Sequence, residues 1–359
     1  MTDPVRLVTH ADVMSAAQDA ETFSSRTSRH LHVPNGMDGE EHRAFRAIVD
    51  RQMTPAIVEA MQPMLDATAA EIVDALARGA AFDAVAELGE VFAVRAQSRW
   101  LGWSEQLETG LRDWMAENYA AAREGDPARN AAVAAAFDEI VTTQIGAHRA
   151  ARKHGTAVDD ATRRLLEERV DGRALTDDEL VSILRNWTAG DLGSLARCVG
   201  VVVHRLAQRP RWQHRMRALA AEISDSGAPQ RAEFDAILGE CLRIDDPFVA
   251  NKRITTCPVT TASGVTIDEG QPVLLDWVTA NKDPEVFTDR FDPQTNAAHN
   301  IVFGTGPHVC PGRDLSFAEL RAVVTALLLG TSAIELAPVP ATRHEPPLGG
   351  WASVPVVIS

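Results

Sequence analysis

Apolar residues recur every three or four positions through much of the first two-thirds of the chain, a spacing that predicts amphipathic helices. This pattern covers residues 54–79 and residues 125–155, and each segment ends on a glycine. The second segment opens with Asp126-Pro127, an N-cap residue followed by a proline that suits the first helical position. We therefore expect two long helices here, each with a charged outer face.

The longest helical pattern lies between residues 175 and 210. Thr176 stands at its start and Glu179 follows three residues later, which together form the sequence signature of a capping box. The pattern continues for about 30 residues to Pro210, well beyond the length of an average globular helix. A helix this long usually crosses the middle of a domain.

The character of the sequence changes after about residue 250. Residues 254–280 alternate β-branched and polar side chains around Ser-Gly and Glu-Gly turns, which predicts two or three short strands. A glycine-rich loop, a helix over about 314–329 and further short strands follow. We find no internal repeat, low-complexity tract or linker in the sequence. The predicted fold class is mainly α with a small β portion (α+β), in a single domain spanning residues 1–359.

Composition narrows the classes of function. The 359 residues are 45% hydrophobic, enough for a large core, and the net charge of −15 argues against nucleic acid and anionic membrane surfaces as partners. The chain opens without a basic segment followed by an apolar one, and the apolar run at 322–339 is broken by Gly330 and Glu335. We expect a soluble cytoplasmic protein. Its four cysteines form no C-x-x-C pair and indicate no disulfide framework: Cys198, Cys241, Cys257 and Cys310.

Cys310 lies in the constrained loop FGTGPHVCPGRDL at residues 303–315. It could be a buried free thiol, a zinc ligand beside His308, or a catalytic nucleophile with a histidine partner elsewhere. The loop glycines permit positive φ and a close approach of the backbone to a large flat group. A helix begins directly after the cysteine, and its N-terminus favours a thiolate. These features together suit a metal held in a macrocycle.

The loop fits the pattern F-G-x-G-x-H-x-C-x-G, which resembles the haem-binding signature of the cytochrome P450 superfamily. Its six fixed positions are filled by Phe303, Gly304, Gly306, His308, Cys310 and Gly312. Further stretches resemble family motifs in the family's order, and the resemblance covers the chain from about residue 5. They are Glu240 and Arg243 as E-x-x-R, residues 281–293, residues 40–46, and the long helix 176–209.

The resemblance implies a soluble, bacterial-type haem-thiolate monooxygenase with haem b (iron protoporphyrin IX) as cofactor and Cys310 as the iron ligand. Glu240 and Arg243 would be structural, the alternative being a surface ion pair. For His42 and Arg46 the alternative is a solvated helix face. The residues implied to bind the cofactor are His42, Arg46, Arg253, Phe303, His308, Cys310 and Gly312.

The distal helix departs from the family pattern (A/G)-G-x-(D/E)-T. Counting back from Pro210 places the alcohol at Ser194, glycine at the acid position, and Asp191 two residues before that glycine. Residues three apart share a helical face. Our hypothesis is a displaced catalytic pair in which Ser194 donates to bound oxygen and Asp191 connects it to solvent. The alternative is that Asp191 caps a kink at Gly190 and Gly193 while water or substrate delivers protons.

Two further departures concern Pro311 and the N-terminal segment. Pro311 has no N–H to offer the neighbouring sulfur, which predicts a more electron-donating thiolate, unless the proline only stiffens the turn. The family's usual N-terminal helix and strands are expected to be absent. Between Phe23 and His42 the chain leaves little room for a helix over the substrate. A more open pocket would follow, covered by a partner or by homodimerisation.

The resemblance implies a reaction that uses O₂ and two electrons to hydroxylate or oxidatively dealkylate a small, hydrophobic organic substrate. The chain has no glycine-rich phosphate loop, so a separate ferredoxin or flavodoxin-type donor with its reductase is implied, docking near Arg313. Other readings are a non-inserting oxidation, such as coupling or peroxide-driven chemistry, and a haem-binding sensor or carrier without turnover. Expected substrate contacts are Trp187, Ala189, Gly190, Phe248, Val249, Ala250 and Trp351.

Overall fold

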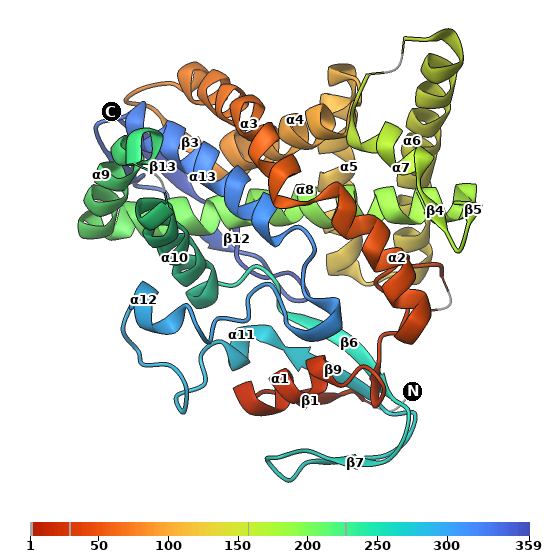
Figure 1. Ribbon diagram of the computed structural model, residues 1–359. Coiled ribbons are helices and arrows are strands. Elements are labelled where there is room, and N and C mark those ends of the chain that lie inside the picture. The colour runs from red at the N-terminus through yellow and green to blue at the C-terminus, as the bar shows by residue number, and fades with distance from the viewer. Residues whose placement is uncertain (1–2, 29, 157, 227) are drawn as a thin grey trace.

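The computed structural model describes residues 3–28, 30–156, 158–226 and 228–359 and is mainly helical, with small sheets (Figure 1). The helices are α1 (His10–Gln18), α2 (Gly39–Gln52), α3 (Pro55–Ala75), α4 (Glu90–Leu101), α5 (Glu108–Glu124), α6 (Pro127–His154), α7 (Ala161–Glu167), α8 (Asp177–Gln208), α9 (Pro210–Ser226), α10 (Ala228–Ile244), α11 (Trp277–Ala280), α12 (Pro293–Asn296) and α13 (Arg313–Leu329). A π-helical turn, η1 (Ala84–Gly89), and two 3₁₀ turns, η2 (Glu105–Leu107) and η3 (Gly306–His308), complete the helical elements.

The strands are short. They are β1 (Val5–Leu7), β2 (Phe23–Ser24), β3 (Ala81–Asp83), β4 (Arg169–Val170), β5 (Arg173–Ala174), β6 (Ala250–Thr255), β7 (Val259–Thr260), β8 (Thr266–Ile267), β9 (Pro272–Asp276), β10 (Ile334–Leu336), β11 (Thr342–Arg343), β12 (Trp351–Ser353) and β13 (Pro355–Ile358). The region 250–276 thus holds four strands, where the sequence predicted two or three.

The helix predictions are largely confirmed. In α8 the Thr176 hydroxyl accepts from the N–H of Glu179, and the Glu179 carboxylate accepts from the N–H of Thr176, so the capping box forms. The Asp126 side chain caps α6. The segment 54–79 was predicted to stay helical to its glycine, but α3 ends at Ala75. It stops early because the N–H of Gly79 donates to Ile358 at the end of β13, where the chain turns into β3.

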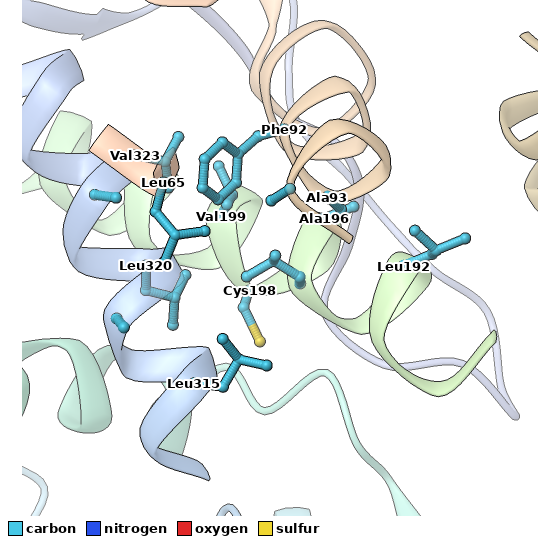
Figure 2. Close-up of a cluster of buried hydrophobic side chains, with 14 of the residues drawn as sticks. Leu65, Phe92, Ala93, Leu192, Ala196, Cys198, Val199, Leu315, Leu320 and Val323 are labelled. Carbon is cyan, nitrogen blue, oxygen red and sulfur yellow. The ribbon is translucent and has the colours of Figure 1, made fainter. Parts of the chain in front are cut away.

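The long helix α8 runs across the molecule as the sequence predicted (Figure 1). It packs against α4 and α13, and α13 also packs against α3. Figure 2 shows apolar side chains from all four helices meeting in the core, among them Leu65, Phe92, Val199 and Val323. These side chains are almost completely buried. Packing against α4 and α13, with α3 supporting α13, therefore fixes the position and direction of α8.

The largest sheet has the strand order β1-β9-β6-β2, with β1 parallel to β9 and β6 antiparallel to it. It carries a second, smaller core that includes Leu7, Phe23, Val273 and Trp277. The N-terminal segment thus contributes two strands and α1 to this sheet and its core. The loss of an earlier helix and strand pair stays a prediction.

Another sheet, β10-β13-β3, joins the C-terminus to the end of α3. Among the described residues, no helix is both long enough and apolar enough to span a membrane.

Candidate functional site

A cavity lies between α8 and the loop that carries Cys310. It holds about 1510 Å³ of space free of protein atoms, including its opening to solvent, and apolar side chains form much of its wall. The α8 wall is formed by Asn186, Trp187, Gly190, Asp191, Ser194, Leu195 and Cys198. The opposite wall is formed by Val302, Phe303, Gly304, Thr305, His308, Cys310, Pro311 and Gly312. The sequence-predicted ligand loop and distal helix therefore face each other across one space.

Backbone contacts fix the shape of the Cys310 loop. The N–H of Cys310 donates to the carbonyl of Phe303 at 2.9 Å, and Gly304 and Gly306 have φ of 73° and 71°. A Cβ on Gly306 would lie 2.4 Å from the carbonyl oxygen of Ala17 in α1. The sequence suggested that these glycines make room for a flat ligand. For Gly306 the requirement comes instead from close packing against α1.

The Cys310 thiol lies just before α13, where Gly312 donates its backbone N–H to the sulfur. We expected the helix N-terminus to favour the thiolate. Burial outweighs that effect and raises the pKa of Cys310 to about 11. A thiol in this state is a poor nucleophile by itself, whereas a bound cation would deprotonate it. The described residues contain no group of three or more His, Cys, Asp or Glu that could hold a metal ion.

Two histidines and an arginine lie together at and behind one part of the cavity wall. His308 and Arg253 line the cavity, and the rings of His42 and His308 lie 4.2 Å apart. Burial, together with the positive charges of His42 and Arg253, lowers the pKa of His308 to about 4. Burial also lowers the pKa values of His42 and Arg253. The facing carboxylate is Asp38, 3.4 Å from Nε2 of His308.

Arg253 carries a positive charge here, and the lowered pKa values leave His42 and His308 as mainly neutral rings that can donate an N–H. The propionate groups of a haem would accept from these donors and supply negative charge to Arg253. Cys310 would hold the iron, and a Cβ added at Gly312 would lie in ordinary contact with its sulfur, at 3.9 Å. The residues present therefore fit a haem.

Arg46 holds the Cys310 loop from outside the cavity. Its Nη1 donates to the carbonyls of Pro307 and Val309 at 3.0 and 2.8 Å, and its Nε pairs with Asp50 at 2.6 Å. The side chain is 16% exposed, and His42 is buried. Neither residue therefore forms a solvated helix face, although His42 and Arg46 are absent from the lining of the cavity.

The proposed pair on α8 is not joined by a hydrogen bond in the described residues. The hydroxyl of Ser194 donates to the carbonyl of Gly190, and the carboxyl of Asp191 accepts from the amide of Gln97 on α4. Burial raises the pKa of Asp191 to about 7. Asp191 is half-buried and lines the cavity, and its connection to solvent stays a prediction.

The glycine at the family's acid position has a steric explanation. A Cβ on Gly193 would lie 2.7 Å from the hydroxyl oxygen of Tyr119 on α5. Tyr119 is itself nine-tenths buried and its ring lies 5.6 Å from the guanidinium carbon of Arg197. No larger side chain fits at position 193 unless Tyr119 moves.

A sequence model of the cytochrome P450 family matches residues 128–350 of this chain. The chain belongs to the cytochrome P450 family of monooxygenases. It is 29% identical to the cyclomarin C epoxidase CymV of Salinispora arenicola, over 95% of this chain and 87% of that protein. It is 28% identical to the erythromycin C-12 hydroxylase of Saccharopolyspora erythraea, over 89% of this chain and 80% of that protein. Family membership implies a haem-thiolate cofactor.

The fold of this P450 also matches a solved structure. It superposes on a mutant of P450 EryK in complex with erythromycin B with a TM-score of 0.85, covering 98% of this chain and 90% of that one. The two sequences are 24% identical, so the match shows the shared fold.

Glu240 and Arg243 of this P450 form a buried pair that anchors the chain leading to Cys310. Arg243 donates to Glu240 at 2.7 and 2.9 Å and also donates to the carbonyl of Asn281. Asn296 donates to Glu240 at 2.8 Å, and Asn281 accepts from the N–H of Ile301 at 3.0 Å. The side chains of Glu240 and Arg243 are 1% and 4% exposed, which excludes the alternative of a surface ion pair.

The expected substrate contacts divide into two groups. Trp187, Gly190 and Phe248 line the cavity of this P450, and the side chain of Ala189 lies outside the described residues. Val249, Ala250 and Trp351 are not among the lining residues. Trp351 instead stacks on His204 with ring centroids 3.9 Å apart and lies under Arg343 at 4.0 Å.

Sequence reasoning missed several lining residues: Pro34, Asn35, Val49, Met53, Gln97, Trp100, Asn251 and Trp277. Most come from segments that carry no recognisable motif. Gln97 did leave a signal, because it is a polar residue on the apolar face of α4, between Val94 and Leu101. A buried amide of this kind needs polar partners, and here it contacts Asp191.

Proposed function

We propose that this P450 hydroxylates or oxidatively dealkylates a small, mainly hydrophobic organic molecule, with haem b as its cofactor. The observation that carries the proposal is the shared cavity between Cys310 and α8, with the N–H donors of His308 and the cationic Arg253 in its wall. The apolar wall and the indole of Trp187 favour an apolar substrate, because polar groups of a substrate would find no hydrogen-bond partners on an apolar wall.

Each group of residues has a role in this reaction. Haem bound at this site would supply activation of O₂ by two electrons. Cys310 would hold the iron as a thiolate, because the charge of the cation would favour loss of the thiol proton. His308 and Arg253 hold the propionates and fix the orientation of the ring. Trp187 and Phe248 exclude water from the reacting substrate, which protects the reaction from side products.

Protons reach the cavity from the α8 wall. Asp191 holds a proton near neutral pH because burial raises its pKa to about 7. Ser194 lies three residues further along α8 and lines the same cavity, so its hydroxyl is placed to donate a hydrogen bond there once it leaves the carbonyl of Gly190. We propose that these two residues serve the reaction separately and do not form a directly bonded pair.

We further propose that electrons come from a separate ferredoxin or flavodoxin-type protein with its reductase. Arg313 is exposed at the start of α13, three residues after Cys310, and offers a positive charge to an acidic donor. The single-domain organisation, the cytoplasmic location and homodimerisation stay predictions.

The experiment is turnover with a surrogate ferredoxin and reductase against a panel of apolar compounds. Compounds are first selected by a shift of the haem absorption band, which reports displacement of a ligand from the iron. The proposal predicts substrate-dependent NADH and O₂ consumption with an oxygenated product. Binding without O₂ consumption would favour a sensor or carrier, and product formed with peroxide alone would favour the peroxide-driven reading.

A further inference from the structure

Three helices bring two carboxyl groups and one amide together beneath the cavity. Gln97 lies on α4, Asp191 on α8 and Glu319 on α13, and Figure 2 shows these helices converging around Leu320 and Ala196. The Gln97 amide donates to Asp191 Oδ2 and also hydrogen-bonds the carboxyl of Glu319. Gln97 and Glu319 are each 1% exposed. We call these three residues the carboxyl-amide cluster.

The carboxyl-amide cluster has no compensating positive charge. Neither Asp191 nor Glu319 forms an ion pair with a Lys, Arg or His within the described residues. The negative charge of Asp191 in turn raises the pKa values of two nearby thiols, Cys198 on α8 and Cys310 in the ligand loop. Two ionised carboxylates in such surroundings would repel each other without screening. At least one of them must therefore hold a proton at neutral pH.

The unpartnered atoms indicate which carboxyl holds it. Oε1 of Gln97 and Oε2 of Glu319 are buried acceptors without a hydrogen-bond partner in the described part of the chain. A proton on Glu319 turns its carboxyl into a donor that can satisfy Oε1 of Gln97, while the Gln97 N–H remains on Asp191. Burial and the charge of Asp191 both raise the pKa of Glu319 well above its ordinary value. Asp191 lines the cavity, and Glu319 does not.

We propose that Glu319, held protonated, and Gln97 are positioning residues that orient Asp191 as the proton donor at the cavity wall. This inference rests on the proposed monooxygenase function. In each transfer one proton leaves the Asp191 carboxyl for an acceptor in the cavity, and solvent entering through the mouth of the cavity returns one proton. No electrons move in this step, and Glu319 keeps its proton throughout.

The first test is spectroscopic and needs no turnover. Infrared difference spectra of the purified haem protein at pH 8 should show a protonated carboxylic acid band, separate from any band of the buried Asp246, that is lost in Glu319→Gln and kept in Asp191→Asn and Asp246→Asn. Glu90→Gln is the matched control, a half-buried acid on the same α4 that lies 3.8 Å from Arg112. It should keep the band. Absence of the band in the wild type, or its survival in Glu319→Gln, would overturn the proposal.

The second test is the pH profile of product formed per NADH consumed. In Glu319→Leu the amide of Gln97 loses its anchor, so its N–H donates less to Asp191. Because that donation lowers the pKa of Asp191, the profile should move to higher pH by about one unit. Glu319→Gln keeps a neutral donor and should restore the wild-type profile. Equal shifts in both variants would refute a neutral Glu319.

The two tests separate this inference from the proposed function. If no compound is oxygenated, the monooxygenase proposal fails, while the infrared band still decides whether Glu319 is protonated. If turnover occurs but both Glu319 variants keep the wild-type profile, the positioning role fails and the function stands.

Discussion

Glu240→Gln should destabilise this P450 strongly, because the change removes the countercharge of a buried guanidinium. The carboxylate accepts from Arg243 at 2.7 and 2.9 Å, from Asn296 at 2.8 Å and from the N–H of Asp292 at 3.1 Å. Glutamine keeps one acceptor oxygen, and its NH₂ group would face an Arg243 donor. Breaking a buried pair in this way costs about 3–5 kcal/mol. Of a typical stability of about 5–15 kcal/mol, this is a large fraction.

The assay is urea unfolding of the purified variant, with the haem-to-protein ratio measured in parallel. Haem retention should fall too, because Asn281 links Arg243 to Ile301 just before the Cys310 loop. The matched control is Glu71→Gln, in which an exposed carboxylate loses Arg95 at 2.9 Å and Arg99 at 3.2 Å. That change should cost at most about 1 kcal/mol. Equal losses in the two variants, or a loss below about 1 kcal/mol for Glu240→Gln, would refute the reasoning.

Three further changes test separate contacts. Gly193→Ala should lower the free energy of unfolding by about 1–3 kcal/mol, and adding Tyr119→Phe should recover part of it in thermal melts, since the clash is with the hydroxyl. Gly306→Ala should lower haem content, because φ is 71° and the new Cβ would meet the carbonyl of Ala17. Asp191 binds its proton more tightly in the folded state than in the unfolded state. Its contribution to the free energy of unfolding therefore falls as pH rises from about 4 to about 7. Urea midpoints of Asp191→Asn should therefore exceed the wild type above pH 7 and converge with it at low pH.

The sequence was informative wherever local physics decides the structure. The capping box at Thr176 and the Asp126 cap marked true helix starts, because capping depends on residues within one turn. The ligand loop was recognisable because its glycines, histidine and cysteine stand close together in the chain. The end of α3 was misplaced because the contact from Gly79 to Ile358 spans most of the chain.

Contacts between distant segments explain what the sequence left open in the site. Gly306 was interpreted as making room for a ligand, but its neighbour Ala17 lies almost 300 positions away in the sequence. No feature of the sequence near Asp191 predicts that Gln97 and Glu319 lie beside it. The packing of α4 and α13 against α8 brings the three residues together. The displaced acid on α8 could be seen from the sequence, whereas its hydrogen bond with Gln97 could not.

The central claim is that Cys310 holds the haem iron as a thiolate. The most direct measurement is the absorption spectrum of the reduced, carbon monoxide-bound protein for the wild type, Cys310→Ser and Cys198→Ser. Cys198 is the matched control, a buried thiol that lines the same cavity. We predict a thiolate-type spectrum for the wild type and Cys198→Ser and its loss in Cys310→Ser. A thiolate-type spectrum that survives in Cys310→Ser, or that disappears in Cys198→Ser alone, would contradict the account.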